Sequence, residues 1–235
     1  AGFEPGRGTK GVGSFQPRRL ALEGAEAFEG KQIHYKVRSA AEYHGRRLAV
    51  FGGGDSALDW AMELAPKAAA LTLIHRRAEF RGAPASVARV RELAATGKLR
   101  FIEGAASALR HSDGRLAGVD IRGADGVIHA VDAEQLLVFF GLAPKLGPIA
   151  QWGLELDKRA LKVDTEKFAT SISGIFAIGD INSYPGKKKL ILSGFHEAAL
   201  AAFAVQHYLY PAKKQFLQYT TTSPVMLKRL GVGTD

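Results

Sequence analysis

The chain has 235 residues, of which 46% are hydrophobic and 23% charged, a balance typical of a globular protein with one or two domains. It has neither an apolar run of about 18 residues, as a membrane span needs, nor a secretory signal pattern, so we expect a cytoplasmic protein. Cysteine is absent, which excludes thiol and disulfide chemistry. The net charge of +9 favours anionic partners, although the basic residues follow no nucleic-acid-binding pattern.

The first elements predict a parallel α/β unit. We expect a strand at residues 32–37 and a second at 47–51, which runs directly into three glycines. Apolar residues at helical spacing follow over 57–64, and Pro66 ends that helix before a strand at 71–74. This strand–glycine–helix–strand order is typical of nucleotide-binding domains.

A helix and a β-meander are expected next. The helix covers residues 84–96, and the strand candidates after it are 99–102, 116–122, 127–131 and 135–140. The sequence Gly-Ala-Asp-Gly at 123–126 predicts a turn within the meander.

The chain changes character at residues 141–148, where two prolines and two glycines predict a hinge. A short buried strand is expected at 175–178, ending at Gly179 and Asp180, and an Ala-rich helix at about 194–208. The segment from 211 to 235 is predicted to be a polar and aromatic tail.

A dinucleotide fingerprint lies between the second strand and the first helix, at residues 52–57. Gly52 permits the tight turn, Gly54 lets a pyrophosphate approach the backbone, and Ala57 allows the helix to pack on the strand. The helix N-terminus attracts the phosphates. We therefore expect a dinucleotide on residues Gly52, Gly53, Gly54, Asp55, Ser56 and Ala57.

The residues after the next strand indicate which dinucleotide. An NAD site has Asp or Glu there, whereas this chain has His75, Arg76 and Arg77, with Arg81 four residues further on. Guanidinium groups suit bidentate recognition of phosphate, so the pattern predicts a 2′-phosphate and hence NADP(H).

Residues 50–57, 75–77 and 175–180 together resemble the thioredoxin-reductase-type flavoproteins. Because the Cys-x-x-Cys of true thioredoxin reductases is missing, the chain is more similar to the cysteine-free branch, the ferredoxin (flavodoxin)–NADP reductases. The resemblance implies an FAD-dependent enzyme that passes electrons from NADPH to ferredoxin or flavodoxin and forms a homodimer. The acidic carrier would dock on a basic face to which Lys187–Lys189 and Lys213–Lys214 contribute.

The resemblance also implies site residues. Asp180 matches the carboxylate that meets the FAD ribityl chain, and the helix at 194–199 would face the flavin. Tyr219 matches an aromatic residue stacked on the flavin. The residues assigned to FAD are Phe15, Pro17, Gly179, Asp180, Ala198, Tyr219 and Thr222, and Gly141 joins the NADP residues.

The fold expected from this resemblance is a Rossmann-like NADPH domain, with a parallel sheet and a meander, plus part of a second Rossmann-like FAD domain. Residues 1–31 would end a first FAD-domain segment, 32–142 form the NADP(H) domain, 143–211 the second FAD segment, and 212–235 a tail over the flavin. The family's own FAD fingerprint would precede residue 11. Two alternatives stay open, a related flavoprotein that reduces another oxidant and a non-catalytic NADP-binding fragment.

Overall fold

The computed structural model describes residues 14–213 and 219–232. The chain divides into two compact units, one spanning Phe15–Ala143 and the other formed chiefly by the residues from Pro144 on. The chain passes between them through β1 (Ser14–Pro17) and β9 (Leu142–Lys145), which pair with each other. The expected hinge at 141–148 includes this division.

The first unit is built on a seven-stranded sheet with the strand order β2-β8-β3-β4-β5-β6-β7. The pairs from β2 to β5 are parallel, and β5-β6 and β6-β7 are antiparallel. The strands are β2 (Ile33–His34), β3 (Arg47–Phe51), β4 (Ala70–His75), β5 (Arg100–Ser112), β6 (Arg115–Gly123), β7 (Ile128–Asp132) and β8 (Gln135–Val138). The predicted parallel sheet with a β-meander is confirmed.

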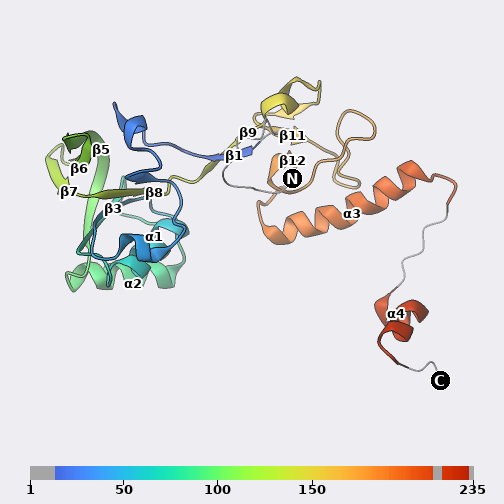
Figure 1. Ribbon diagram of the computed structural model, residues 1–235. Coiled ribbons are helices and arrows are strands. Elements are labelled where there is room, and N and C mark those ends of the chain that lie inside the picture. Colours follow the sequence, from blue (N-terminus) through green and yellow to red (C-terminus); the bar gives the residue numbers. More distant parts are fainter. Residues whose placement is uncertain (1–13, 214–218, 233–235) are drawn as a thin grey trace. The chain divides into compact units, whose positions relative to one another are not determined.

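Two helices cover one face of this sheet, α1 (Asp55–Leu64) and α2 (Pro84–Ala95), and the meander lies on its other side (Figure 1). Side chains of β3 alternate between two hydrophobic clusters, because successive residues of a strand point to opposite faces. Leu48 and Val50 pack with the helices, whereas Ala49 and Phe51 pack with the meander. Burial on both faces holds the register of β3 and so places the glycines that follow it.

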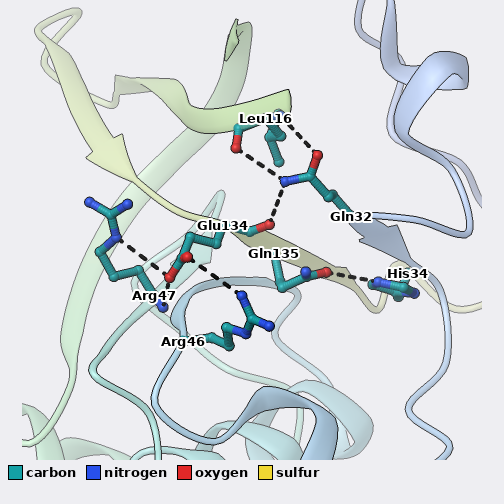
Figure 2. Close-up of polar contacts among 7 residues, drawn as sticks. All are labelled: Gln32, His34, Arg46, Arg47, Leu116, Glu134 and Gln135. Atoms are coloured by element: carbon teal, nitrogen blue, oxygen red, sulfur yellow. Dashed lines mark hydrogen bonds and ion pairs between the residues drawn. The ribbon is translucent and has the colours of Figure 1, made fainter. Parts of the chain in front are cut away.

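Polar side chains tie the strands together at the end of the sheet where β3 begins (Figure 2). The Gln32 side-chain amide donates to the carbonyls of Leu116 and Glu134 at 3.1 and 3.0 Å, and accepts from the Leu116 N–H at 2.9 Å. The Glu134 carboxylate accepts from the Arg47 N–H at 3.0 Å and pairs with the side chains of Arg46 and Arg47. This network is structural, since Arg47 begins β3 and the glycines follow its other end.

The second unit has a small three-stranded sheet of β10 (Leu156–Asp157), β11 (Ala160–Lys162) and β12 (Asn182–Ser183). Its long helix is α3 (Ile191–Leu209), and a short helix, α4 (Pro224–Arg229), lies in the tail. The short 3-10 helices of this unit are η3 (Gly147–Gln151), η4 (Gly179–Ile181) and η5 (Thr220–Thr222), and those of the first unit are η1 (Ala25–Phe28) and η2 (Ala40–Tyr43). A separate cluster of buried side chains, including Leu161, Phe168 and Ala201, forms the core of the second unit.

Three expected strands are corrected. The strand expected at 99–102 is much longer, because β5 continues to Ser112 and pairs with β6 as well as β4. The strand expected at 32–37 is confined to Ile33–His34, because only these residues pair with β8. The buried strand expected at 175–178 does not form. Only an isolated antiparallel bridge joins Ala169 and Phe176, and Ile178 is 42% exposed. In the described residues this segment bonds to the 168–170 loop, so it lacks the neighbouring strands that would make it part of a sheet.

The compact unit Phe15–Ala143 also contains residues 15–31, which the sequence analysis grouped with an FAD-domain segment. Leu20, Ala25 and Phe28 are buried in the same cluster as Ala49 and Phe51 of the sheet. This packing places residues 15–31 with the sheet, and the assignment of the segment to an FAD domain stays a prediction.

Candidate functional site

The glycine-rich turn links the carboxyl end of β3 to the first turn of α1. Gly52 has φ +143°, and a Cβ there would lie 2.7 Å from the Phe139 carbonyl oxygen and 2.8 Å from the Ala57 Cβ. Both the turn and the close approach of helix to strand therefore require glycine at this position. Gly54 differs, since a Cβ added to it would meet no atom within 4 Å. The backbone at Gly54 thus faces open space that a ligand could use.

This turn opens onto a hollow of about 990 Å³ within the first unit. Residues 52–56 line one part of it, His75, Arg76 and Arg81 another, and residues 139–142 a third. The Ala57 N–H bonds to the Gly54 carbonyl oxygen at 3.0 Å, but the amides before it in the first turn have no acceptor within a regular helix. The start of α1 therefore offers donors and the positive end of its dipole here. A volume of this size suits a ligand as large as a dinucleotide.

His75 lies beneath the glycine turn, with only 9% of its surface exposed. A Cβ on Gly53 would fall 2.4 Å from its Nε2 atom, and its ring stacks on Phe80 with centroids 5.7 Å apart. Burial, and then the nearby charges of Arg76 and Arg81, lower the pKa of His75 below its usual value. In the structure His75 supports the turn, and its predicted contact with a 2′-phosphate stays a prediction.

The cations at the hollow are arginines on the loop that follows β4. Arg76, Arg77 and Arg81 are all exposed, and no ion pair involves them within the described chain. Arg76 and Arg81 line the hollow, whereas Arg77 does not. Unpaired guanidiniums beside a cavity are available for an anionic ligand. Gly141, with φ +82°, lines the same hollow.

The second unit holds the Gly179-Asp180 turn, which lies in η4 between the 175–178 segment and β12. Gly179 has φ +76°, and Asp180 is exposed. The turn is held from behind by Glu197 of α3, which is fully buried. The Glu197 carboxylate accepts from the Gly179 N–H at 2.7 Å and the Tyr184 hydroxyl at 2.9 Å, and it also pairs with the Lys187 ammonium.

Two further contacts complete this network. The Asn182 side-chain amide donates to Glu197 at 2.9 Å, and Lys187 Nζ donates to the Gly179 carbonyl oxygen at 2.9 Å. Burial would raise the pKa of Glu197, but the hydrogen bonds from Lys187 and Gly179 outweigh it and hold the pKa below its usual range. A carboxylate with four donors stays ionised and fixes the backbone at Gly179.

Glu197 was not expected to be a structural residue, and Lys187 was expected on a docking face. The side chain of Lys187 is 8% exposed, so the structure takes it out of that face. The charged Glu197 inside an Ala-rich apolar helix was a signal of a buried partner, because charged residues are rarely fully buried unless paired.

The remaining residues assigned to FAD belong to several elements of the two units. Phe15 and Pro17 lie in β1 and are half-buried, and Ala198 lies on α3. Tyr219 is 66% exposed, and its carbonyl oxygen accepts from the Thr222 hydroxyl at 3.3 Å. The roles of these residues toward FAD stay predictions. Lys214, of the expected docking face, and residues 1–13 lie outside the described residues.

Residues 11–206 match the family model described as pyridine nucleotide-disulphide oxidoreductase, and the chain belongs to this family. "Ferredoxin--NADP reductase 2" of Cupriavidus metallidurans is 58% identical over 224 residues, which cover 95% of this chain and 61% of that protein. "Ferredoxin--NADP reductase" of Albidiferax ferrireducens is 57% identical and covers 94% of this chain and 64% of its own length. The chain thus spans about 60% of the length of such curated relatives.

Solved structures agree on the fold. Lactococcus lactis thioredoxin reductase superposes with a TM-score of 0.72 at 22% identity, over 84% of this chain and 64% of that one. The T. acidophilum thioredoxin reductase superposes with a TM-score of 0.71 at 20% identity, over 85% of this chain and 64% of that one. These values confirm the expected α/β fold of a Rossmann-like domain with part of a second one.

Two kinds of feature are absent from the described residues. No helix there is long and apolar enough to cross a membrane. Nor do three or more His, Cys, Asp or Glu side chains gather there in a way that could hold a metal ion.

Proposed function

We propose that the chain is the NADP(H)-binding part, with a segment of the FAD-binding part, of a flavoprotein that passes electrons between NADPH and ferredoxin or flavodoxin. The observation that carries the proposal is the hollow of about 990 Å³ that joins the glycine turn to the unpaired Arg76 and Arg81. Relatives 52–58% identical over most of the chain, all named ferredoxin–NADP reductases, support the same reaction.

The residues of the first unit fit NADP(H). The open backbone at Gly54 and the first-turn amides of α1 would hold the pyrophosphate, and Arg76 and Arg81 would hold the 2′-phosphate. Arg77 is exposed on the same loop and would add to the positive potential. The two residues directly after β4 are Arg76 and Arg77 rather than the Asp or Glu that would favour the 2′-hydroxyl of NAD.

The residues of the second unit fit part of an FAD site. Asp180 is an exposed carboxylate on a turn held by the buried Glu197, and the N-terminal part of α3 begins close behind it in sequence. Flavin, when bound, would take a hydride from NADPH and release electrons one at a time. The protein would orient the two ring systems and exclude water, and no side chain is needed as a nucleophile.

The partner and the setting follow from the same proposal. An acidic electron carrier would be attracted by the net charge of +9. We further propose a homodimer located in the cytoplasm. Sedimentation of the protein at micromolar concentration checks the dimer.

The experiment combines a spectrum with an assay, on this chain and on one extended to the length of its relatives. Flavin absorbance bands in the purified protein test FAD binding. NADPH- and NADH-driven reduction of ferredoxin, flavodoxin and a quinone tests the reaction, and we expect NADPH with a protein carrier to be fastest. Replacing Arg76 and Arg77 by Ala should remove about 2 to 4 kcal/mol of the preference for NADPH.

Three outcomes would contradict the proposal. Faster turnover with the quinone indicates another oxidant. Flavin-free protein at both lengths indicates a non-catalytic NADP-binding protein. An equal loss of NADPH and NADH affinity in the double arginine variant would show that these arginines do not recognise the 2′-phosphate.

A further inference from the structure

The loop that carries Arg81 is attached to the glycine turn at two points. One is a backbone hydrogen bond from the Arg81 N–H to the Gly53 carbonyl oxygen, at 2.6 Å. The other is made by a side chain, since Asp55 Oδ1 accepts from the Ala83 N–H at 2.8 Å. Asp55 is the first residue of α1, so one carboxylate links the start of that helix to a residue 28 positions away.

Most of this loop is exposed, so few contacts hold it besides these two bonds. Residues 76–79 and Ala83 are exposed, whereas Phe80 packs between His75 and Phe101 and Gly82 lies against Leu58 of α1. Ala83 is the N-cap of α2 and has no side chain that could cap it. The Asp55 carboxylate accepts from the N–H of the N-cap residue, as the acidic residue of a capping box does in other helices. Together with the bond from the Arg81 N–H to Gly53, it fixes the loop at Arg81 and two residues further on.

A direct contact between Asp55 and the dinucleotide is disfavoured by charge. A carboxylate beside a pyrophosphate would repel it, whereas a carboxylate turned toward Ala83 is already bonded. The cost of ordering a long arginine side chain falls when the backbone beneath it is fixed in advance.

We infer that Asp55 is a positioning residue that sets the preference for a 2′-phosphorylated nucleotide by holding Arg81 in place. The inference rests on the proposed function, because it takes the 2′-phosphate to be the ligand of Arg81. It assigns Asp55 no contact with the cofactor, in contrast to the expectation from the fingerprint alone.

The test is calorimetric titration of the 235-residue chain with NADP⁺ and NAD⁺. Asp55→Ala should weaken NADP⁺ binding about three- to tenfold, as the loss of one hydrogen bond predicts, and NAD⁺ binding by less than about twofold. Asp55→Asn should retain most of the NADP⁺ affinity, because its amide oxygen can still accept from Ala83. The matched control is Asp59→Ala, an exposed carboxylate of the same helix.

A double-mutant cycle shows whether Asp55 acts through Arg81. Arg81→Ala should lower the NADP⁺ preference, and adding Asp55→Ala to it should cause no further loss of that preference. Additive losses would overturn the inference. Tighter binding of both nucleotides to Asp55→Asn would overturn it too, because it would show that Asp55 acts by its charge on the pyrophosphate.

Amide hydrogen exchange without nucleotide separates this inference from the proposed function. Faster exchange at Arg81 and Ala83 in Asp55→Ala than in Asp59→Ala supports the attachment, and unchanged exchange refutes it. Equal affinities of the unmodified chain for NADP⁺ and NAD⁺ would refute the proposed function instead, whatever the exchange rates show.

Discussion

His75 shows how a single residue can serve a site without binding its ligand. Its ring fills the space under Gly53, and burial together with Arg76 lowers its pKa from 6.5. The unfolded chain therefore binds this proton more readily than the folded one, so acidification below about 6.5 favours unfolding. We expect the free energy of unfolding to fall as the pH drops below about 6.5, with a contribution from His75 of at most about 1.4 kcal/mol per pH unit.

His75→Gln should make this pH dependence shallower. The measurement is urea unfolding at a series of pH values, and the control is His44→Gln, which removes an exposed imidazole from the same unit. If His75→Gln changes the pH dependence of the free energy of unfolding no more than His44→Gln does, the lowered pKa of His75 in the folded protein is contradicted.

At the scale of elements, the buried pair of Lys187 and Glu197 joins η4 to α3. Removing one partner leaves the other buried and uncompensated, so Glu197→Gln and Lys187→Met should each destabilise the protein by about 3 to 5 kcal/mol. The double variant should cost much less than the sum, because neither charge then remains. Thermal or urea unfolding measures all three.

The exposed pair of Glu155 and Lys162 is the matched control in the same unit, with side chains 62% and 59% exposed. Glu155→Gln should cost less than about 1 kcal/mol. Additive losses at Lys187 and Glu197 would mean that the two residues stabilise the Gly179 turn independently rather than as a pair.

At the scale of the whole molecule, the excess of positive charge is partly gathered around a second hollow of about 630 Å³. Lys158, Arg159, Lys188 and Lys189 line it, are exposed and make no ion pair within the described chain. If the proposed acidic carrier docks here, replacing both Lys188 and Lys189 by Glu should raise the KM for the carrier at least about threefold at low salt. Added salt screens the charges, so it should reduce the difference in KM between this variant and the unmodified protein.

The control for this prediction is Lys98→Glu with Arg100→Glu, which makes the same change of net charge on exposed residues of the other unit. Steady-state reduction of ferredoxin or flavodoxin at several ionic strengths compares the two variants. Equal effects of both pairs would show that overall charge, rather than this surface, attracts the carrier.

The sequence alone was sufficient for the features that depend on local pattern. A continuous apolar run that ends at three glycines predicted β3, because a strand buried on both faces has apolar residues throughout. Apolar residues at helical spacing predicted α1, an apolar Ala-rich segment predicted α2, and the turn sequence at 123–126 predicted the meander. The glycine turn was predictable because Gly52 has a conformation that only glycine tolerates easily. The strand expected at 175–178 was wrong, since an apolar run becomes a strand only where other strands pair with it.

Only the tertiary structure decided which side chains meet. It placed His75 under Gly53, brought Asp55 to Ala83, and gathered Gly179, Tyr184 and Lys187 around Glu197. These contacts join segments far apart in the chain, so they depend on the path of the backbone and leave no period in the sequence. The residue types that bind a nucleotide are therefore readable from the sequence, whereas the residues that hold them in position become visible only when the chain is folded.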